Sequence, residues 1–227
     1  MKTRPLFTAA LLASLLGATP ATATAPAPLA VGLGPGSWIS LEGTSTLHPY
    51  SSRSTKVVLA ATRRGDVADP ADAGALVELA KGALVQGATL EVPVRTLLSG
   101  ESGLDKNLWK TLKSDEYPRI QYRMTSYAVA PAASADSMRV RVEGTLEVAG
   151  VQRPVPLDLT AARGPDGVVL EGLSSLKMSD FGVTPPRLFL GALRVGDRIV
   201  VRYHLLVVPR GAGEEPPASA GMERGRP

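Results

Sequence analysis

Apolar and polar residues alternate along most of the chain. The clearest run covers residues 138–148, where the apolar side chains fall on even positions and arginine, glutamate and threonine fill the odd ones. Because successive side chains of a strand point to opposite faces, this pattern predicts a strand with one buried face. The same reading predicts strands at 90–94, 120–124 and 199–207, and weaker runs near 37–44, 55–62, 153–162 and 168–177. The chain is therefore predicted to be all-β, with about eight strands.

Turn signals between the strands predict short connections. Ala149-Gly150 follows the 138–148 run directly, and a Gly-Pro-Asp-Gly sequence occupies 164–167. Short connections join neighbouring strands in opposite directions, so we expect an antiparallel sheet. Residues 71–84 fit a short helix or a strand equally well.

One helix is predicted with a clear start, over residues 103–113. Ser102 can cap it, Asp105 stands three residues further on in a capping-box position, and leucines recur every four residues from Leu104 to Leu112. Strands with one apolar face can close into a barrel that holds one small ligand, and this helix would then cover one end. A two-sheet sandwich with a solid core has the same alternation, so the pattern alone does not choose between the two.

The first residues have the order of a secretory signal peptide. Two basic residues precede an apolar run over 6–16, and small residues near 21–25 suit cleavage. That run is shorter than the roughly 20 residues of a membrane-spanning helix, so we expect a soluble protein, periplasmic or secreted. The predicted organisation is a signal peptide (1–25), a Gly/Pro linker (26–36), a single domain (37–209) and a disordered tail (210–227).

Composition excludes several function classes. The chain has no cysteine, so it has no disulfide, no thiolate metal site and no lipidated cysteine. The formal charge of +4 includes two basic residues of the signal, and aromatic residues make up only 4% of the chain. Both values argue against nucleic-acid binding, which needs clustered cations and stacking aromatics.

The inventory for catalysis is small. The chain has two histidines, of which His204 alternates with apolar neighbours and is interpreted as a solvent-side strand residue. Ser174 and Lys177 have the spacing of a serine acyltransferase motif, and 180–182 reads Asp-Phe-Gly, but the companion motifs of both signatures are missing. No metal-ligand spacing occurs. We expect no catalytic residue, no metal and no cofactor.

Several motifs, in order, carry a resemblance to a known family. Residues 102–124 read SGLDKNLWKTLKSDEYPRIQYRM and residues 141–159 read RVEGTLEVAGVQRPVPLDL. Upstream, 43–48 reads GTSTLH and 90–100 reads LEVPVRTLLSG. This order resembles the YceI-like family, in its Gly-Thr-Ser-Thr-Leu-His variant. The resemblance implies an extended, antiparallel, lipocalin-like β-barrel and an exported, non-enzymatic protein that binds a polyisoprenoid or related lipid.

The resemblance favours the barrel over the sandwich and so suggests which residues line a tunnel. One departure, Leu108-Trp109 in place of a His-Leu or paired-Phe pattern, leaves the ligand's identity open. His48, Arg187 and Arg194 are candidates for contact with a lipid headgroup at the mouth; a turn residue before Pro49 and solvated loop arginines are the alternatives. The expected lining residues are Leu90, Val92, Ile120, Tyr122, Met124, Val140, Val142, Leu146, Val148, Leu157, Leu159, Val201, Tyr203 and Leu205.

Two other functions remain open from the sequence. One is an envelope structural or interaction module, with a solid barrel core and a protein partner. The other is a hydrolase, which would need serine, histidine and acid groups in one pocket. The expected partner of the leading hypothesis is a long-chain isoprenoid or other lipid. The oligomeric state is open, a homodimer included.

Overall fold

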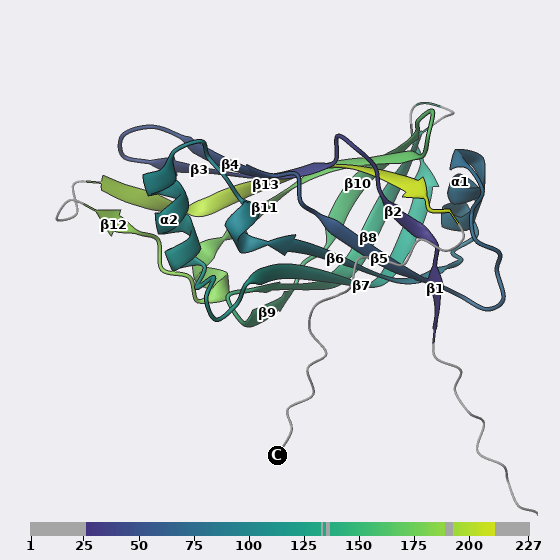
Figure 1. Cartoon of the computed structure of the whole chain (residues 1–227), viewed down its shortest axis with the longest axis horizontal. Helices are drawn as coiled ribbons and strands as arrows, with labels where there is room; N and C mark the ends of the chain where they lie inside the picture. The colour runs from purple at the N-terminus through teal and green to yellow at the C-terminus, as the bar shows by residue number, and fades with distance from the viewer. Residues whose placement is uncertain (1–25, 133, 135–136, 189–192, 212–227) are drawn as a thin grey trace, which may run out of the picture.

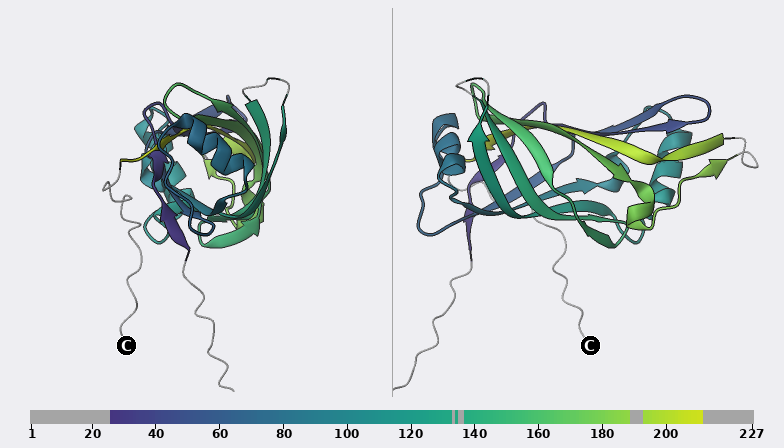
Figure 2. Two further views of the ribbon diagram at one scale, coloured as in Figure 1. Left: turned by 90° about the vertical axis from the view of Figure 1, so that its right-hand side faces the viewer. Right: turned by 180° about the vertical axis from the view of Figure 1, so that it is seen from behind.

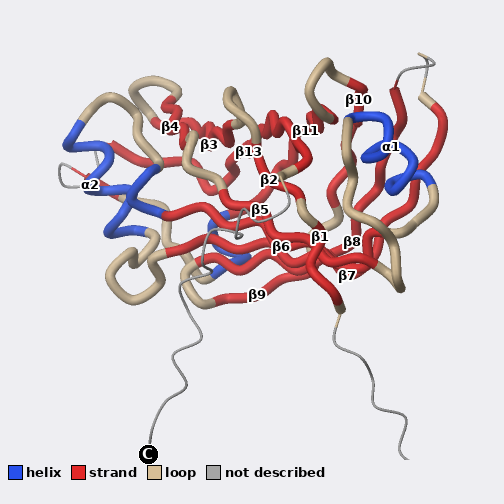
Figure 3. The backbone as a smooth tube through the Cα atoms, turned by 45° about the vertical axis from the view of Figure 1, so that its right-hand side comes forward, coloured by secondary structure: helices blue, strands red, loops and turns tan. Residues whose placement is uncertain are grey.

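One antiparallel sheet, curled around its long axis, forms most of the computed structural model, which describes residues 26–132, 134, 137–188 and 193–211 (Figure 1). The helix α1 (Ala73–Lys81) covers one end of the curled sheet and α2 (Ser102–Thr111) the other (Figure 3). Two short 3-10 helices are η1 (Val94–Thr96) and η2 (Met178–Phe181). The strands are β1 (Ala27–Leu29), β2 (Val31–Leu33), β3 (Trp38–Ser45), β4 (Tyr50–Ser54), β5 (Val58–Arg63), β6 (Val85–Pro93), β7 (Arg119–Pro131), β8 (Ser137–Val148), β9 (Val151–Pro154), β10 (Leu157–Arg163), β11 (Val168–Lys177), β12 (Arg187–Leu188) and β13 (Leu193–Pro209).

The strand order follows the chain for most of the sheet. It runs β1-β5-β6-β7-β8-β10-β11-β13-β3-β4, with β9 on β8 and with β2 and β12 on β13. Seen along its length, the sheet curls round on itself (Figure 2). The all-β, antiparallel prediction is therefore confirmed. The number of strands was wrong: the described residues form thirteen, not about eight, because short strands add to the long ones at both ends.

The closed barrel that was predicted is replaced by a curled sheet with a seam. Among the described residues, the strand order ends at β1 and β4, which do not pair. Two contacts span the seam instead. At one end β1 pairs with β5 while β2 pairs with β13. At the other, the backbones of Arg53 and Leu98 exchange two hydrogen bonds of 2.8 and 3.0 Å.

The segment 26–36 is a structural part of the sheet, which corrects its prediction as a linker. Leu29 and Val31 are only 6% and 4% exposed, and the amide of Gly34 donates to Leu206 O at 2.8 Å. Leu29, Val31 and Leu33 alternate as in any strand; glycines and prolines obscure that pattern in the sequence. The predicted signal peptide and nearly all of the predicted tail lie outside the described residues.

Alternation places side chains as predicted in the central strands. In β8, Met138, Val140 and Val142 are buried while the residues between them are exposed. In β7, a bulge between Met124 and Ser126 shifts the alternation by one residue. Beyond that bulge Tyr127 lies on the buried side, where a strict period of two would have turned it outward.

The helices form for local reasons. The ambiguous 71–84 segment contains α1, which begins where the Asp72 side chain accepts from the Ala75 amide at 2.8 Å. The hydroxyl of Tyr127 donates to Ala80 O at 3.0 Å and holds α1 over the sheet. The second helix was predicted almost correctly, but its cap was not. Glu101 stands at the N-cap without a side-chain bond, and the buried Asp105 accepts from both the amide and the hydroxyl of Ser99 at 2.7 Å.

Candidate ligand-binding lumen and its openings

The half of the sheet near α2 encloses a cavity of about 130 Å³, which we call the lumen. Inward side chains of seven strands form its wall, and residues beside η1, α2 and η2 complete it. The wall is apolar except for one serine and two tyrosine hydroxyls. The lining residues are Ile39, Leu41, Leu90, Val92, Leu97, Leu112, Ile120, Tyr122, Leu146, Val148, Val155, Leu157, Ser174, Leu176, Met178, Phe181, Val183, Ile199, Val201 and Tyr203.

The structure divides the predicted lining residues into two groups. Those that line the lumen are Leu90, Val92, Ile120, Tyr122, Leu146, Val148, Leu157, Val201 and Tyr203. The other group, Met124, Val140, Val142, Leu159 and Leu205, packs into or against the buried apolar cluster without lining the lumen. All of them share the inward face, so alternation could not separate the groups.

Several lining residues escaped the sequence reasoning because they lie outside regular strands. Leu97 follows η1, and the indole of Trp109 in α2 donates to its carbonyl at 3.3 Å, which ties this segment to the helix. Phe181 and Val183, both 4% exposed, flank the turn after η2. Leu112 could have been found, since it belongs to the apolar stripe of the predicted helix.

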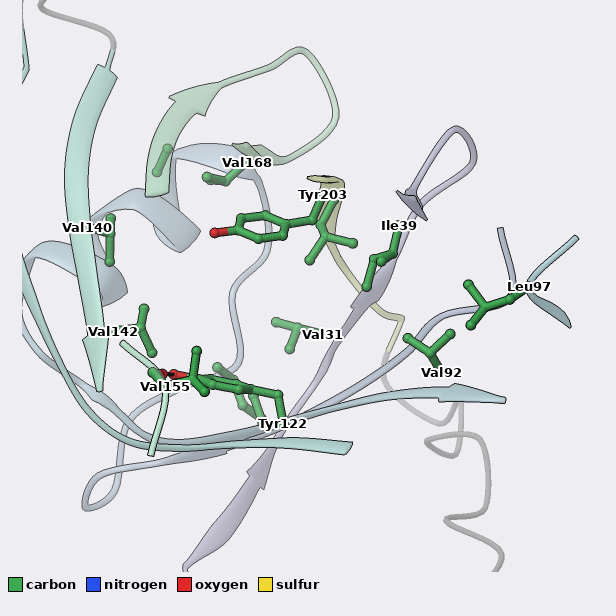
Figure 4. Packing of buried hydrophobic residues seen from close by; sticks show 14 of the residues in the cluster. Val31, Ile39, Val92, Leu97, Tyr122, Val140, Val142, Val155, Val168 and Tyr203 are labelled. Carbon is green, nitrogen blue, oxygen red and sulfur yellow. Dashed lines mark hydrogen bonds between the residues drawn. The ribbon is translucent and has the colours of Figure 1, made fainter. Parts of the chain in front are cut away.

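Two tyrosines form the floor of the lumen. Tyr122 donates to Val155 O at 2.9 Å, and the Tyr203 hydroxyl lies 3.4 Å from Ser174 Oγ. Figure 4 shows both rings reaching across the interior, with Ile39, Val92 and Leu97 on one side and Val140 and Val142 on the other. Burial raises the pKa of Tyr122 to about 12, with further contributions from Glu143 and Tyr203. Burial also raises the pKa of Tyr203.

Glycines on neighbouring strands make room for these rings. A Cβ on Gly144 would lie 2.5 Å from the Tyr122 ring, and one on Gly172 would lie 2.5 Å from the Tyr203 ring. Both distances are well inside van der Waals contact, so each ring occupies the space of a missing side chain. The floor thus depends on glycine at both positions.

Beyond the floor, the half of the sheet near α1 is filled by side chains. Val142 and Leu205 are each 7% exposed, and they belong to the same buried cluster as Leu76 and Leu79 of α1. Leu29 of β1 joins this cluster as well. Helix and N-terminal strand therefore supply the apolar groups that fill this end.

The lumen has an opening at the α2 end, which we call the end pocket. It holds about 340 Å³ between α2 and the β3–β4 connection, and it shares Met178 with the lumen. Its polar side chains include Tyr50, Asn107 and His48. The exposed His48 ring has its Nδ1 2.8 Å from Pro49 O, which agrees with the turn interpretation while placing the ring at an opening.

A second opening, the side groove, lies in the wall of the sheet and shares Val155, Ser174, Leu176 and Phe181 with the lumen. It holds about 770 Å³ and is lined by Arg153, Pro154, Val155, Pro156, Asp158, Leu173, Ser174, Ser175, Leu176, Ser179, Asp180 and Phe181. No motif in the sequence pointed to it. It lies where β9, which pairs with β8, and residues 173–177 of β11, which pair with β13, do not pair with each other.

The remaining candidate residues lie away from these openings. Arg194 is exposed and lines neither opening, and the Arg187 side chain lies outside what the structure describes, although its backbone forms part of β12. His204 is on the outer face, as predicted. Its Nδ1 lies 2.7 Å from Glu171 Oε1 and its ring stacks on Trp38 with centroids 6.0 Å apart. In the described residues, no three histidine or acidic side chains gather as a metal site would require.

Comparison with known proteins identifies the family. A family model described as YceI-like domain matches residues 47–207, well over half of the chain. The chain belongs to the YceI-like family. Its sequence motifs had suggested this family, and the match confirms them. A comparison with curated proteins found no match.

Two solved structures share the fold of this YceI-like chain. A polyisoprenoid binding domain from Saccharophagus degradans, implicated in plant cell wall breakdown, has a TM-score of 0.57 at 15% identity, covering 80% of this chain and 99% of that one. BcnA of Burkholderia cenocepacia has a TM-score of 0.55 at 17% identity, covering 76% and 96%. At these identities the likeness concerns the fold alone. No helix within the described ranges has the length and apolar character needed to cross a membrane.

Proposed function

We propose that this chain is an exported, non-enzymatic lipid-binding protein that holds the apolar chain of a polyisoprenoid or similar amphiphile in its lumen. The observation that carries the proposal is the chemistry of the lumen wall, where aliphatic and aromatic carbon is interrupted only by Ser174 and the hydroxyls of Tyr122 and Tyr203. Such a wall binds a hydrocarbon chain by burial alone, at about 0.8 kcal/mol for each buried methylene. Membership of the YceI-like family and the fold shared with a polyisoprenoid binding domain support it.

The size of the lumen limits how the ligand is held. A cavity of about 150 Å³ accommodates one benzene-sized group, and the lumen is about 130 Å³. A longer chain must therefore extend into one of the two openings or displace the floor. The end pocket and the side groove supply polar groups next to apolar ones, as an amphiphile requires.

Native mass spectrometry of the protein purified from its host's envelope fraction tests the proposal. We expect a stoichiometric adduct that organic extraction releases and identifies as an isoprenoid or other long-chain amphiphile. Recovery from the envelope fraction would also support the export signal expected at 1–25. An unliganded mass that polyprenyl lipids do not change would contradict the proposal. That result would favour the envelope interaction module. A solid barrel core was expected for that module, whereas in the structure only the half near α1 is filled.

A further inference from the structure

The two tyrosines of the floor come from different parts of the sheet. Tyr122 belongs to β7 and Tyr203 to β13, and three strands lie between β7 and β13 in the strand order. The two residues are only 9% and 7% exposed, and both line the lumen. In Figure 4 their rings reach into the interior from these separate strands. The inner boundary of the lumen is therefore made by two aromatic rings.

Hydrogen bonds hold the hydroxyls of both rings. The Tyr122 hydroxyl donates to Val155 O at 2.9 Å, and the Tyr203 hydroxyl lies 3.4 Å from Ser174 Oγ. If the Tyr122 ring turned aside, the carbonyl of the buried Val155 would lose this donor, and a hydrocarbon chain offers none in exchange. An apolar ligand therefore meets rings that resist displacement.

The residues around the rings restrict them further. A Cβ on Gly144 or on Gly172 would lie 2.5 Å from the ring beside it, so each ring fills a notch in a neighbouring strand. In the filled half, Val142 and Leu205 are each 7% exposed, and neither lines the lumen. Because buried side chains pack closely, the rings could move toward that half only by displacing such residues. The floor is thus supported from the side and from behind.

We propose that Tyr122 and Tyr203 are specificity-determining residues whose rings stop the apolar chain of the ligand and set the length of chain that the lumen buries. This inference rests on the proposed function and adds to it the residues that limit the depth of binding. A cavity of about 150 Å³ holds one benzene-sized group, so the lumen of about 130 Å³ takes about six carbon atoms of a chain. Carbon atoms beyond these lie in an opening, where water still reaches them.

Straight-chain alcohols of two lengths measure this limit. The chain of 1-hexanol ends at the floor, and that of 1-decanol has four more methylenes. If the lumen buried all four, 1-decanol would bind about two hundredfold more tightly than 1-hexanol. With the floor in place, calorimetric titration of the wild-type protein should give a ratio of the two affinities below about twentyfold.

Three substitutions in β7 separate the effect of the ring from those of the hydroxyl and of lost stability. Tyr122→Leu removes the ring and leaves space for about four more carbon atoms, so it should raise the affinity ratio about tenfold. Tyr122→Phe keeps the ring and should leave the ratio within about twofold of the wild-type value. Tyr127→Leu is the matched control, because Tyr127 is also an interior tyrosine of β7 but does not line the lumen. It should likewise leave the ratio unchanged.

The opposite results have separate meanings. A wild-type ratio near two hundredfold would show that the floor yields to the chain, and this overturns the inference while lipid binding stands. The inference also fails if a folded Tyr122→Leu variant keeps the wild-type ratio, or if Tyr127→Leu raises the ratio equally. Thermal melts check folding, and if Tyr122→Leu does not fold, Tyr203→Leu removes the other ring and should raise the ratio in the same way.

Farnesol, an isoprenoid alcohol, tests lipid binding itself. If wild-type protein binds neither farnesol, nor longer polyprenols, nor the straight-chain alcohols, the proposed function fails and the inference fails with it.

Discussion

The two halves of the curled sheet use the same alternating strands, yet one encloses a lumen and the other is filled. Val142 and Leu146 stand four residues apart on the inward face of β8; the first is buried in the filled half and the second lines the lumen. Each half also receives apolar side chains from outside the strands. α1 contributes Leu76 and Leu79 to the filled half, while the α2 segment contributes Leu112 to the lumen wall. The helical segment at each end thus adds its own apolar side chains to the half that it covers.

The largest expected effect compares one leucine from each half. Leu205→Ala removes a side chain that is 7% exposed in the filled half, and it should lower the free energy of unfolding by about 2–5 kcal/mol. Leu157→Ala, at the lumen wall, should cost clearly less, because Leu157 already faces empty space. Chemical denaturation of both variants measures the difference. Equal losses would show that the two halves are packed alike.

The next largest expected loss of stability comes from a substitution at the floor between the two halves. A Cβ at Gly144 would also lie 2.5 Å from Arg123 O, a backbone atom that cannot turn aside. Gly144→Ala should therefore destabilise the protein by about 1–3 kcal/mol. Gly103→Ala is the matched control, since no atom lies within 4 Å of its Cβ position, and it should leave the unfolding midpoint unchanged or higher.

The strands and their inward faces could be predicted from the sequence, but which part of the interior is filled and which is hollow could not. Alternation identified Val142 and Leu146 correctly as inward residues. It does not predict whether the space opposite an inward residue is filled by other side chains or left empty. Leu97 follows the 3-10 helix η1 and Phe181 ends η2, so neither lies in a strand whose period could reveal an inward direction. The segment 26–36 was misjudged because its composition is that of a linker, although Leu29 and Val31 carry the period of a strand.

Removing one hydroxyl from the floor should have a smaller effect. Tyr122→Phe deletes the bond to Val155 O and should cost about 1 kcal/mol at neutral pH. The pKa of Tyr122 is raised from 10.0 to about 12, so between these values the unfolded chain loses a proton that the folded chain keeps. The unfolding free energy of the wild type should fall as pH rises through this window. The fall should be smaller in Tyr122→Phe, as measured by denaturation between pH 8 and 12; parallel curves would assign it to other groups.

The smallest effect adds a methylene to each half. Val201 lines the lumen, so Val201→Ile extends into space that is already empty and should stabilise the protein by at most about 0.8 kcal/mol. Val142→Ile adds the same group where Val142 is 7% exposed within the filled half, and it should destabilise the protein through overpacking. The test is whether the two changes in unfolding free energy have opposite signs, as measured from urea unfolding midpoints. Because Val201→Ile also narrows the lumen, it should weaken farnesol binding, whereas Val142→Ile should leave farnesol binding unchanged. A gain in stability together with a loss of affinity at Val201 would show that the lumen is the space that a ligand occupies.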